Sequence, residues 1–278
     1  MSLQSIDERR DEFAKCFGHH FVGLIGNHRE VNSADGKVTD RVKTFRISGF
    51  VCSIDEDWYF VTAGHALKII EDYLKLEGAA VGAVHLIDNF GAKDKTDDTA
   101  IPFSNAFEKV VVVHSEIDSL DFGVIPLDKN KKQLLTSNGI VAVDANHVHE
   151  QLTRTYSSYA VLGLPTEVNQ ELATESDSMI NVPSTFIVLV ATSEGVIDEI
   201  RAQYENWLVL RLIDQDVIDS IIGMSGGPVL GFQFNDDGSI RYWVVGIQSS
   251  WVKARRHTIV CPTLKFWPAM QSAINQVR

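Results

Sequence analysis

Apolar and polar residues alternate in short runs along most of the chain, and polar turns separate the runs. Short apolar segments bounded by turn residues are typical of β-strands. In the first half we predict strands at residues 20–25, 44–52, 58–62, 83–88, 110–113 and 122–127. In the second half we predict strands at residues 159–164, 186–192, 207–213, 228–232, 243–247 and 258–261. Many short strands favour antiparallel barrels or sandwiches.

Helical spacing of apolar residues is confined to a few segments. Leu67, Ile70 and Leu74 fall on one helical face within residues 66–76. A closing amphipathic helix is predicted at residues 266–277, and helix-like spacing also occurs at 6–17 and 194–204. Strands outnumber these helices, so the fold class that we predict is all-β.

A lysine-rich polar run at residues 128–133 separates two strand-rich halves of the sequence. A chain of 278 residues is long enough to bury two modest cores. We therefore predict two domains, residues 1–130 and residues 131–278.

The charge and the distribution of apolar residues argue against two kinds of partner, nucleic acids and membranes. The formal net charge is −12, and binding to phosphates needs clustered Lys and Arg, so we expect no nucleic-acid partner. No run of about 18 apolar residues occurs, so we expect no segment that enters a membrane. With 45% hydrophobic and 22% charged residues, the chain has the composition of a packed globular protein.

The segment Gly223-Met-Ser-Gly-Gly-Pro228 places one serine among three glycines, where a backbone turns tightly and leaves its amide hydrogens free. Upstream, Val61-Thr-Ala-Gly-His65 and Leu120-Asp-Phe-Gly-Val-Ile125 supply a histidine and an aspartate. A serine hydroxyl is a poor nucleophile at neutral pH, so it needs a base, and that base needs a partner to orient it. The order His, Asp, Ser along the chain is that of chymotrypsin-type chemistry.

On these three motifs the chain resembles the trypsin/chymotrypsin-like serine proteases, closest in style to the bacterial high-temperature-requirement proteases. The resemblance implies two antiparallel β-barrels with a C-terminal helix, the first barrel carrying His65 and Asp121 and the second carrying Ser225. It implies a serine endopeptidase that cleaves polypeptides through an acyl-enzyme intermediate and needs no cofactor. Too few residues follow Ser225 for the peptide-binding module of the high-temperature-requirement proteases, so we expect none.

Each motif residue has a role in this interpretation. His65 is the general base, Asp121 orients it, and Ser225 is the nucleophile. The backbone N–H groups of Gly223 and Ser225 are the candidate oxyanion donors. Asp118 is an alternative to Asp121, but only Asp121 directly precedes the apolar strand pattern.

Substrate binding is predicted from positions on either side of the serine. Asp219 stands six positions before Ser225, where trypsin carries the aspartate that selects basic residues. Ser249 matches the serine of the family's substrate-binding strand, and Trp251 stands where a pocket-wall glycine is expected. Because a tryptophan there would fill the pocket, a preference for Arg or Lys stays open.

Met224 departs from the secreted members of the family. Their zymogens place an aspartate immediately before the nucleophile, where it pairs with a freed N-terminus. We therefore expect that N-terminal cleavage does not activate this site.

The chain has three cysteines, Cys16, Cys52 and Cys261. Secreted members of the resembled family usually have more, because several disulfides cross-link them. Such a set favours a reducing compartment. The first 13 residues lack the apolar segment of a signal peptide. We predict a cytoplasmic protein, with a secreted form whose signal peptide was removed as the alternative.

Two other functions compete with an active protease. The serine motif also fits Gly-x-Ser-x-Gly, the nucleophile elbow of α/β-hydrolase esterases, with Asp236 or Asp237 and His257 as partners. A protease-like binding or regulatory protein with a closed or weakly active site is the second alternative. No metal site is predicted, because His147 with His149, and His19 with His20, lack an evident third ligand.

Overall fold

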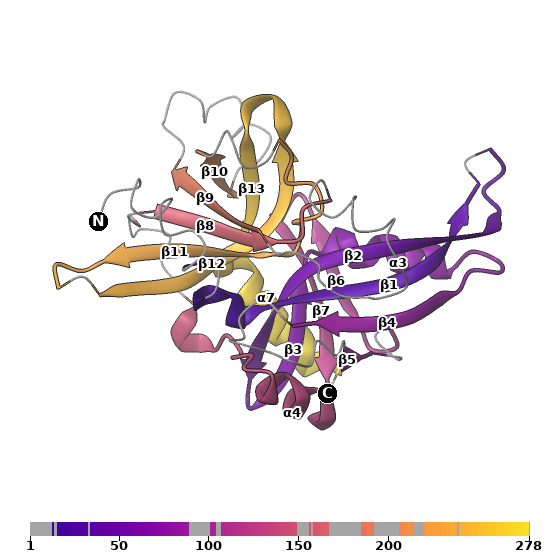
Figure 1. Cartoon of the computed structure of the whole chain (residues 1–278), viewed down its shortest axis with the longest axis horizontal. Coiled ribbons are helices and arrows are strands. Elements are labelled where there is room, and N and C mark those ends of the chain that lie inside the picture. The colour runs from indigo at the N-terminus through magenta and orange to yellow at the C-terminus, as the bar shows by residue number, and fades with distance from the viewer. Residues whose placement is uncertain are drawn as a thin grey trace.

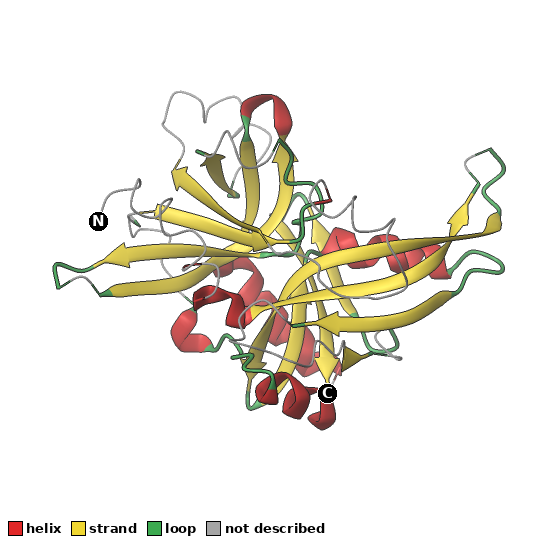
Figure 2. Cartoon of the chain, viewed as in Figure 1, coloured by secondary structure: helices red, strands yellow, loops and turns green. Residues whose placement is uncertain are grey.

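The computed structural model describes residues 13, 16–32, 34–88, 101–103, 107–148, 156, 158–166, 185–191, 206–213, 219–237 and 239–277. Strands dominate these residues and form two antiparallel units (Figures 1 and 2). The predicted all-β class, with two antiparallel units and a C-terminal helix, is confirmed. No helix in this part of the chain is long and apolar enough to cross a membrane. Most of the segment at 6–17, and all of 194–204, lie outside the described residues.

The first unit is a seven-stranded antiparallel sheet in the order β5-β4-β1-β2-β3-β7-β6. Its strands are β1 (Phe21–Val31), β2 (Val38–Ile54), β3 (Asp57–Thr62), β4 (Val81–Ile87), β5 (Ile101–Pro102), β6 (Val111–Ser115) and β7 (Leu120–Leu127). Asp55 and Glu56 join β2 to β3 in a two-residue turn, and both have positive φ, which suits the right-handed twist of a hairpin.

The second unit is a closed six-stranded barrel in the cyclic order β10-β13-β12-β11-β8-β9. Its strands are β8 (Ser158–Gly163), β9 (Thr185–Ala191), β10 (Leu208–Leu212), β11 (Pro228–Phe234), β12 (Ile240–Val252) and β13 (His257–Pro262). Every residue of β8 and β13 is buried. Closure pairs the strands around the full ring, so these buried backbones have partners on both sides.

Apolar packing joins the two units. Phe21, Phe50 and Phe122 of the sheet belong to the same buried cluster as Leu162 and Leu230 of the barrel. Helix α7 (Thr263–Val277) contacts β7 of the sheet and both β12 and β13 of the barrel, and its yellow ribbon lies near the centre of Figure 1. Burying one such aromatic side chain contributes about 1.5 to 3 kcal/mol, so the packing between units is a major part of the fold's stability.

Two helices differ from the sequence expectations. Helix α3 (Gly64–Leu74) begins earlier than predicted and therefore includes His65. The polar run expected to separate the two domains begins helix α4 (Lys129–Ser137), because the Asp128 side chain accepts a hydrogen bond from the Lys131 amide and caps the helix. Position 130 lies inside this helix, whose Leu135 is buried in the cluster of the first unit. The domain division at 130 and 131 stays a prediction.

Candidate active site

His65 is placed by the junction of β3 with α3. β3 ends at Thr62, whose hydroxyl donates a 2.7 Å hydrogen bond to the Ser48 carbonyl. The helix begins two residues later, so His65 lies in its first turn beside β7.

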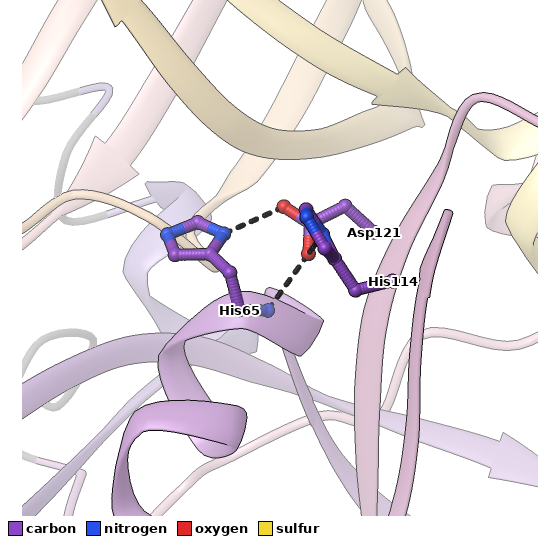
Figure 3. A group of neighbouring side chains, drawn as sticks. All are labelled: His65, His114 and Asp121. Carbon is purple, nitrogen blue, oxygen red and sulfur yellow. Dashed lines mark hydrogen bonds and ion pairs between the residues drawn. The ribbon is translucent and has the colours of Figure 1, made fainter. Parts of the chain in front are cut away.

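Asp121, the second residue of β7, holds the His65 imidazole. Its side chain is fully buried and accepts a 2.7 Å hydrogen bond from His65 Nδ1. The other carboxylate oxygen accepts a 2.9 Å hydrogen bond from the His65 backbone amide. A hydrogen on Nδ1 leaves Nε2 with the lone pair of the neutral ring, and in Figure 3 Nε2 points away from Asp121. In that tautomer the nitrogen free to accept a proton thus lies on the side opposite the carboxylate.

The carboxylate of Asp121 is ionised at neutral pH. Burial by itself raises the pKa of Asp121, but the hydrogen bond and charge of His65, together with a hydrogen bond from the Ser249 hydroxyl, lower it to about 2. The alternative acid, Asp118, is exposed and accepts a hydrogen bond from the Ser115 hydroxyl instead. Of these two aspartates, Asp121 is the one in contact with His65.

Two further residues reach Asp121, and sequence analysis missed both roles. His114 stands directly opposite Asp121 in the β6–β7 hairpin, and its Nδ1 lies 3.1 Å from a carboxylate oxygen. The register of the hairpin, set by the turn after Ser115, was the signal that would have found it. Cys261 of β13 accepts a 3.4 Å hydrogen bond from the Asp121 amide. Burial raises the pKa of the Cys261 thiol to about 12, so it stays neutral.

The Ser225 loop needs glycine at position 226. Gly226 has a φ of 96°, and a Cβ there would lie 1.9 Å from Thr62 Oγ1 and 2.2 Å from the Ser48 carbonyl oxygen. Its amide donates a 2.8 Å hydrogen bond to the Gln248 carbonyl. The backbone of the Ser225 loop therefore packs so closely against the first unit that position 226 has no room for a side chain.

Ser48 holds the other end of this loop. Its hydroxyl donates a 2.8 Å hydrogen bond to the Gly223 carbonyl and accepts a 2.9 Å hydrogen bond from the Leu164 amide. Gly223 has a φ of 94°, a conformation that favours glycine. Within the described part of the chain, the amides of Gly223 and Ser225 donate to no acceptor. Two backbone donors near the serine are thus left for another partner.

The serine itself is directed toward Ser249. Ser225 Oγ donates a 3.2 Å hydrogen bond to the Ser249 carbonyl, and the Ser249 hydroxyl donates to Asp121. Ser249 therefore contacts both the serine and the aspartate. Among the described residues, no hydrogen bond joins Ser225 to His65. Turning the Ser225 side chain to another staggered rotamer moves its Oγ by about 2 Å, a small motion.

The other predicted substrate-binding residues lie on either side of this group. Trp251 is half-buried and packs against the barrel cluster that contains Ile221, Met224 and Val260. Asp219 is exposed at a bend ahead of the serine loop. Their part in binding a substrate stays a prediction.

The esterase alternative does not fit this arrangement. Ser225 leads into strand β11, whereas an elbow serine leads into a helix. Asp237 accepts hydrogen bonds from Ser239 in a hairpin turn, and His257 lies against the Arg255 carbonyl. Neither partner of that hypothetical site is joined to the serine.

No family model and no curated protein matches the chain. Among solved structures, it is similar to the scabies mite inactivated protease paralogue S-D1, with 12% sequence identity, 92% of each chain covered and a TM-score of 0.47. At that TM-score the likeness adds no argument about the activity of this chain.

Proposed function

We propose that this protein is a serine endopeptidase in which Ser225 is the nucleophile, His65 the general base and Asp121 the orienting acid. The observation that carries the proposal is the buried, ionised Asp121, which binds His65 Nδ1 and is linked to Ser225 through Ser249. A carboxylate held below its usual pKa beside an imidazole is the arrangement that activates a serine.

The first step forms the acyl-enzyme. Ser225 Oγ turns from the Ser249 carbonyl to His65 Nε2 and attacks the peptide carbonyl carbon while Nε2 takes its proton. Asp121 stabilises the imidazolium that results. The carbonyl oxygen becomes an oxyanion and accepts hydrogen bonds from the amides of Gly223 and Ser225. Loss of one such donor typically costs about 3 to 4 kcal/mol of transition-state stabilisation.

Collapse of the tetrahedral intermediate breaks the peptide bond. His65 Nε2–H gives its proton to the leaving amine, which departs and leaves an ester on Ser225. A water molecule then gives a proton to Nε2 and attacks this ester. The acid product leaves as His65 returns the proton to Ser225 Oγ, so the enzyme is restored without a cofactor.

The substrate is a polypeptide, and its side-chain preference depends on Asp219 and Trp251. If the exposed Asp219 contacts the substrate, Arg or Lys before the cut is favoured, whereas a Trp251 ring that takes up the space for that side chain favours small residues. Cleavage of a peptide library by wild type and by Asp219→Ala separates these cases. The side-chain preference measured with this library also tests the proposed resemblance to the bacterial high-temperature-requirement proteases. That resemblance rests on the sequence motifs alone.

Activation does not depend on a freed N-terminus in this proposal. Met224 is fully buried among Val161, Ile187 and Ile221, an apolar environment with no carboxylate at the position that would receive an ammonium group. Placing an unpaired charge there costs several kcal/mol. A protein that carries an N-terminal extension is therefore expected to be as active as one without it.

One observation favours a second candidate, a protease-like binding protein with a weakly active site. Ser225 Oγ donates to the Ser249 carbonyl and not to His65, so the nucleophile is not yet activated in this conformation. The two candidates differ in whether substrate or a partner turns the serine.

Labelling with a fluorophosphonate probe tests the proposed function. Wild type is expected to gain one covalent adduct by intact mass, and Ser225→Ala and His65→Ala to lose it. The control Ser239→Ala, on an exposed hairpin turn, keeps wild-type labelling. Wild type that labels no faster than Ser225→Ala, with and without peptide substrates, overturns the proposal and favours the binding protein.

A further inference from the structure

A second imidazole stands beside the proposed catalytic pair. His65 from α3, His114 from β6 and Asp121 from β7 each turn a ligand atom toward the same point, and these atoms all lie within 4.8 Å of one another. Figure 3 shows both rings facing the carboxylate from different sides. The sequence expectation of no metal site rested on histidines close together in the chain, whereas these three residues come from separate elements.

Two imidazole nitrogens and one carboxylate oxygen are a donor set suited to zinc, with the fourth position left to water. Zinc binds nitrogen at about 2.0 to 2.1 Å and carboxylate oxygen at about 2.0 to 2.2 Å, so tetrahedral ligand atoms are about 3.3 Å apart. The carboxylate of Asp121 lies 2.7 Å from His65 Nδ1 and 3.1 Å from His114 Nδ1. Side-chain shifts of about 1 Å convert this cluster into a coordination site.

Charge and access also suit a cation. Asp121 supplies a carboxylate oxygen, the ligand type that completes the two imidazole nitrogens for a divalent cation. The side chains of His65 and His114 are 33% and 41% exposed, so an ion reaches them from solvent. The His65 amide and the Ser249 hydroxyl still donate to Asp121 from the protein side and fix the carboxylate, as outer partners do in zinc sites.

We propose that His65, His114 and Asp121 form a zinc site that inhibits the enzyme. The proposal rests on the proposed function, because inhibition requires that His65 be the general base. Zinc replaces the hydrogen on His65 Nδ1, and the neutral ring then carries its one hydrogen on Nε2. Without a lone pair, Nε2 does not accept the proton of Ser225, so nucleophilic attack stops although Ser225 and the oxyanion donors are unchanged.

Zinc binding is measured first without catalysis. Metal-free Ser225→Ala, as the full chain, is titrated with zinc chloride by calorimetry, and with cobalt chloride by its visible absorption. One zinc per chain is expected, and adding His114→Ala or His114→Asn is expected to weaken binding at least tenfold. The asparagine variant keeps a donor toward Asp121, so it separates loss of a ligand from loss of folding.

Two controls locate the site. The first control, His147→Ala, removes an imidazole from a different cluster and should leave zinc binding unchanged. In that cluster His20 contacts His19 and Tyr242, and the centroid of the His20 ring is 5.5 Å from that of His147. Magnesium at the same concentration is expected not to bind, because it prefers oxygen ligands. Zinc binding that is equal with and without His114 overturns the site.

Inhibition is then measured on the active chain. Zinc is expected to suppress peptide cleavage by wild type and a chelator to restore it, while His114→Asn needs at least tenfold more zinc for half inhibition of its own zinc-free rate. Unchanged sensitivity of His114→Asn overturns inhibition at this site. Binding that depends on His114 in a chain that never reacts with fluorophosphonate supports the metal site and overturns the proposed function.

Discussion

The two units differ in how many hydrogen bonds their parts of the candidate site already make. In the sheet, Asp121 accepts hydrogen bonds from the His65 ring, the His65 amide and the Ser249 hydroxyl. In the barrel, the amides of Gly223 and Ser225 have no acceptor in the described part of the chain. In the proposed function, the side that orients the base is assembled on folding, whereas the side proposed to meet the substrate has backbone donors without an acceptor among the described residues. This division suits a site whose new hydrogen bonds form as negative charge develops on the substrate.

Each side nevertheless depends on the opposite unit. Ser48 of the sheet holds the Gly223 carbonyl of the barrel, while Ser249 and Cys261 of the barrel hold Asp121 of the sheet. Changes on the two sides should therefore differ in kind. On the base side they should affect chemistry, and on the serine side they should affect the shape of the loop.

The largest effect is expected from Asp121→Asn. The amide no longer accepts from Nδ1–H as a carboxylate does, and it favours the wrong tautomer of His65, so kcat should fall by about 10⁴-fold. The matched change Asp118→Asn, on the exposed turn, should alter kcat less than twofold. Steady-state cleavage of a fluorogenic peptide measures both, and equal losses would show that Asp121 has no special role.

Gly226→Ala should be the most damaging change to the serine loop. Its Cβ would meet the Thr62 hydroxyl and the Ser48 carbonyl, and the positive φ adds strain, so the free energy of unfolding should fall by more than about 3 kcal/mol. Gly78→Ala is the control, because Gly78 also has positive φ but has nothing within 4 Å of the new Cβ. Urea unfolding compares them, and a similar loss at both positions would mean that strain alone, without the contact, explains the effect.

Stability should depend on Asp121 in acid. Its pKa is about 2 in the folded protein and about 3.9 when unfolded, so the unfolded chain binds more protons between these values. The contribution of Asp121, about 2 to 3 kcal/mol, is complete above about pH 5 and is lost as the pH falls through 2. Urea unfolding of wild type and Asp121→Asn from pH 2 to 5 should give a steeper pH dependence for wild type. Parallel curves would contradict a low folded-state pKa.

Ser48→Ala should lower the free energy of unfolding less than Gly226→Ala does. It leaves the Gly223 carbonyl and the Leu164 amide without a partner, which costs about 1 to 2 kcal/mol of unfolding free energy. Peptide-cleavage activity should also fall below that of the surface control Ser239→Ala. The reason is that the Gly223 peptide can rotate once its carbonyl loses the Ser48 hydroxyl. Thermal unfolding and peptide cleavage measured together check this, and full activity would show that Ser48 does not orient the oxyanion donors.

Much of the strand content follows from local pattern. Short apolar runs bounded by polar turns predicted the strands from β1 to β13 except the two-residue β5, but β1, β2 and β12 extend beyond their predicted ends. The exposed start of β2 carries no apolar alternation and is a strand because it pairs with β1. The Asp128 cap that begins helix α4 is a local signal as well. The sequence analysis overlooked it because the lysine-rich run was interpreted as a separator between domains.

The sequence by itself determined the all-β class, the approximate strands and the three motifs with His65, Asp121 and Ser225, because periodicity and glycine placement act within a few residues. Only the tertiary structure decided that His114 faces Asp121, that Ser48 holds Gly223, and that Ser225 donates to Ser249. These contacts depend on strand register and on packing between two units. A one-residue change of register turns every side chain to the other face of a sheet, so no local pattern specifies them.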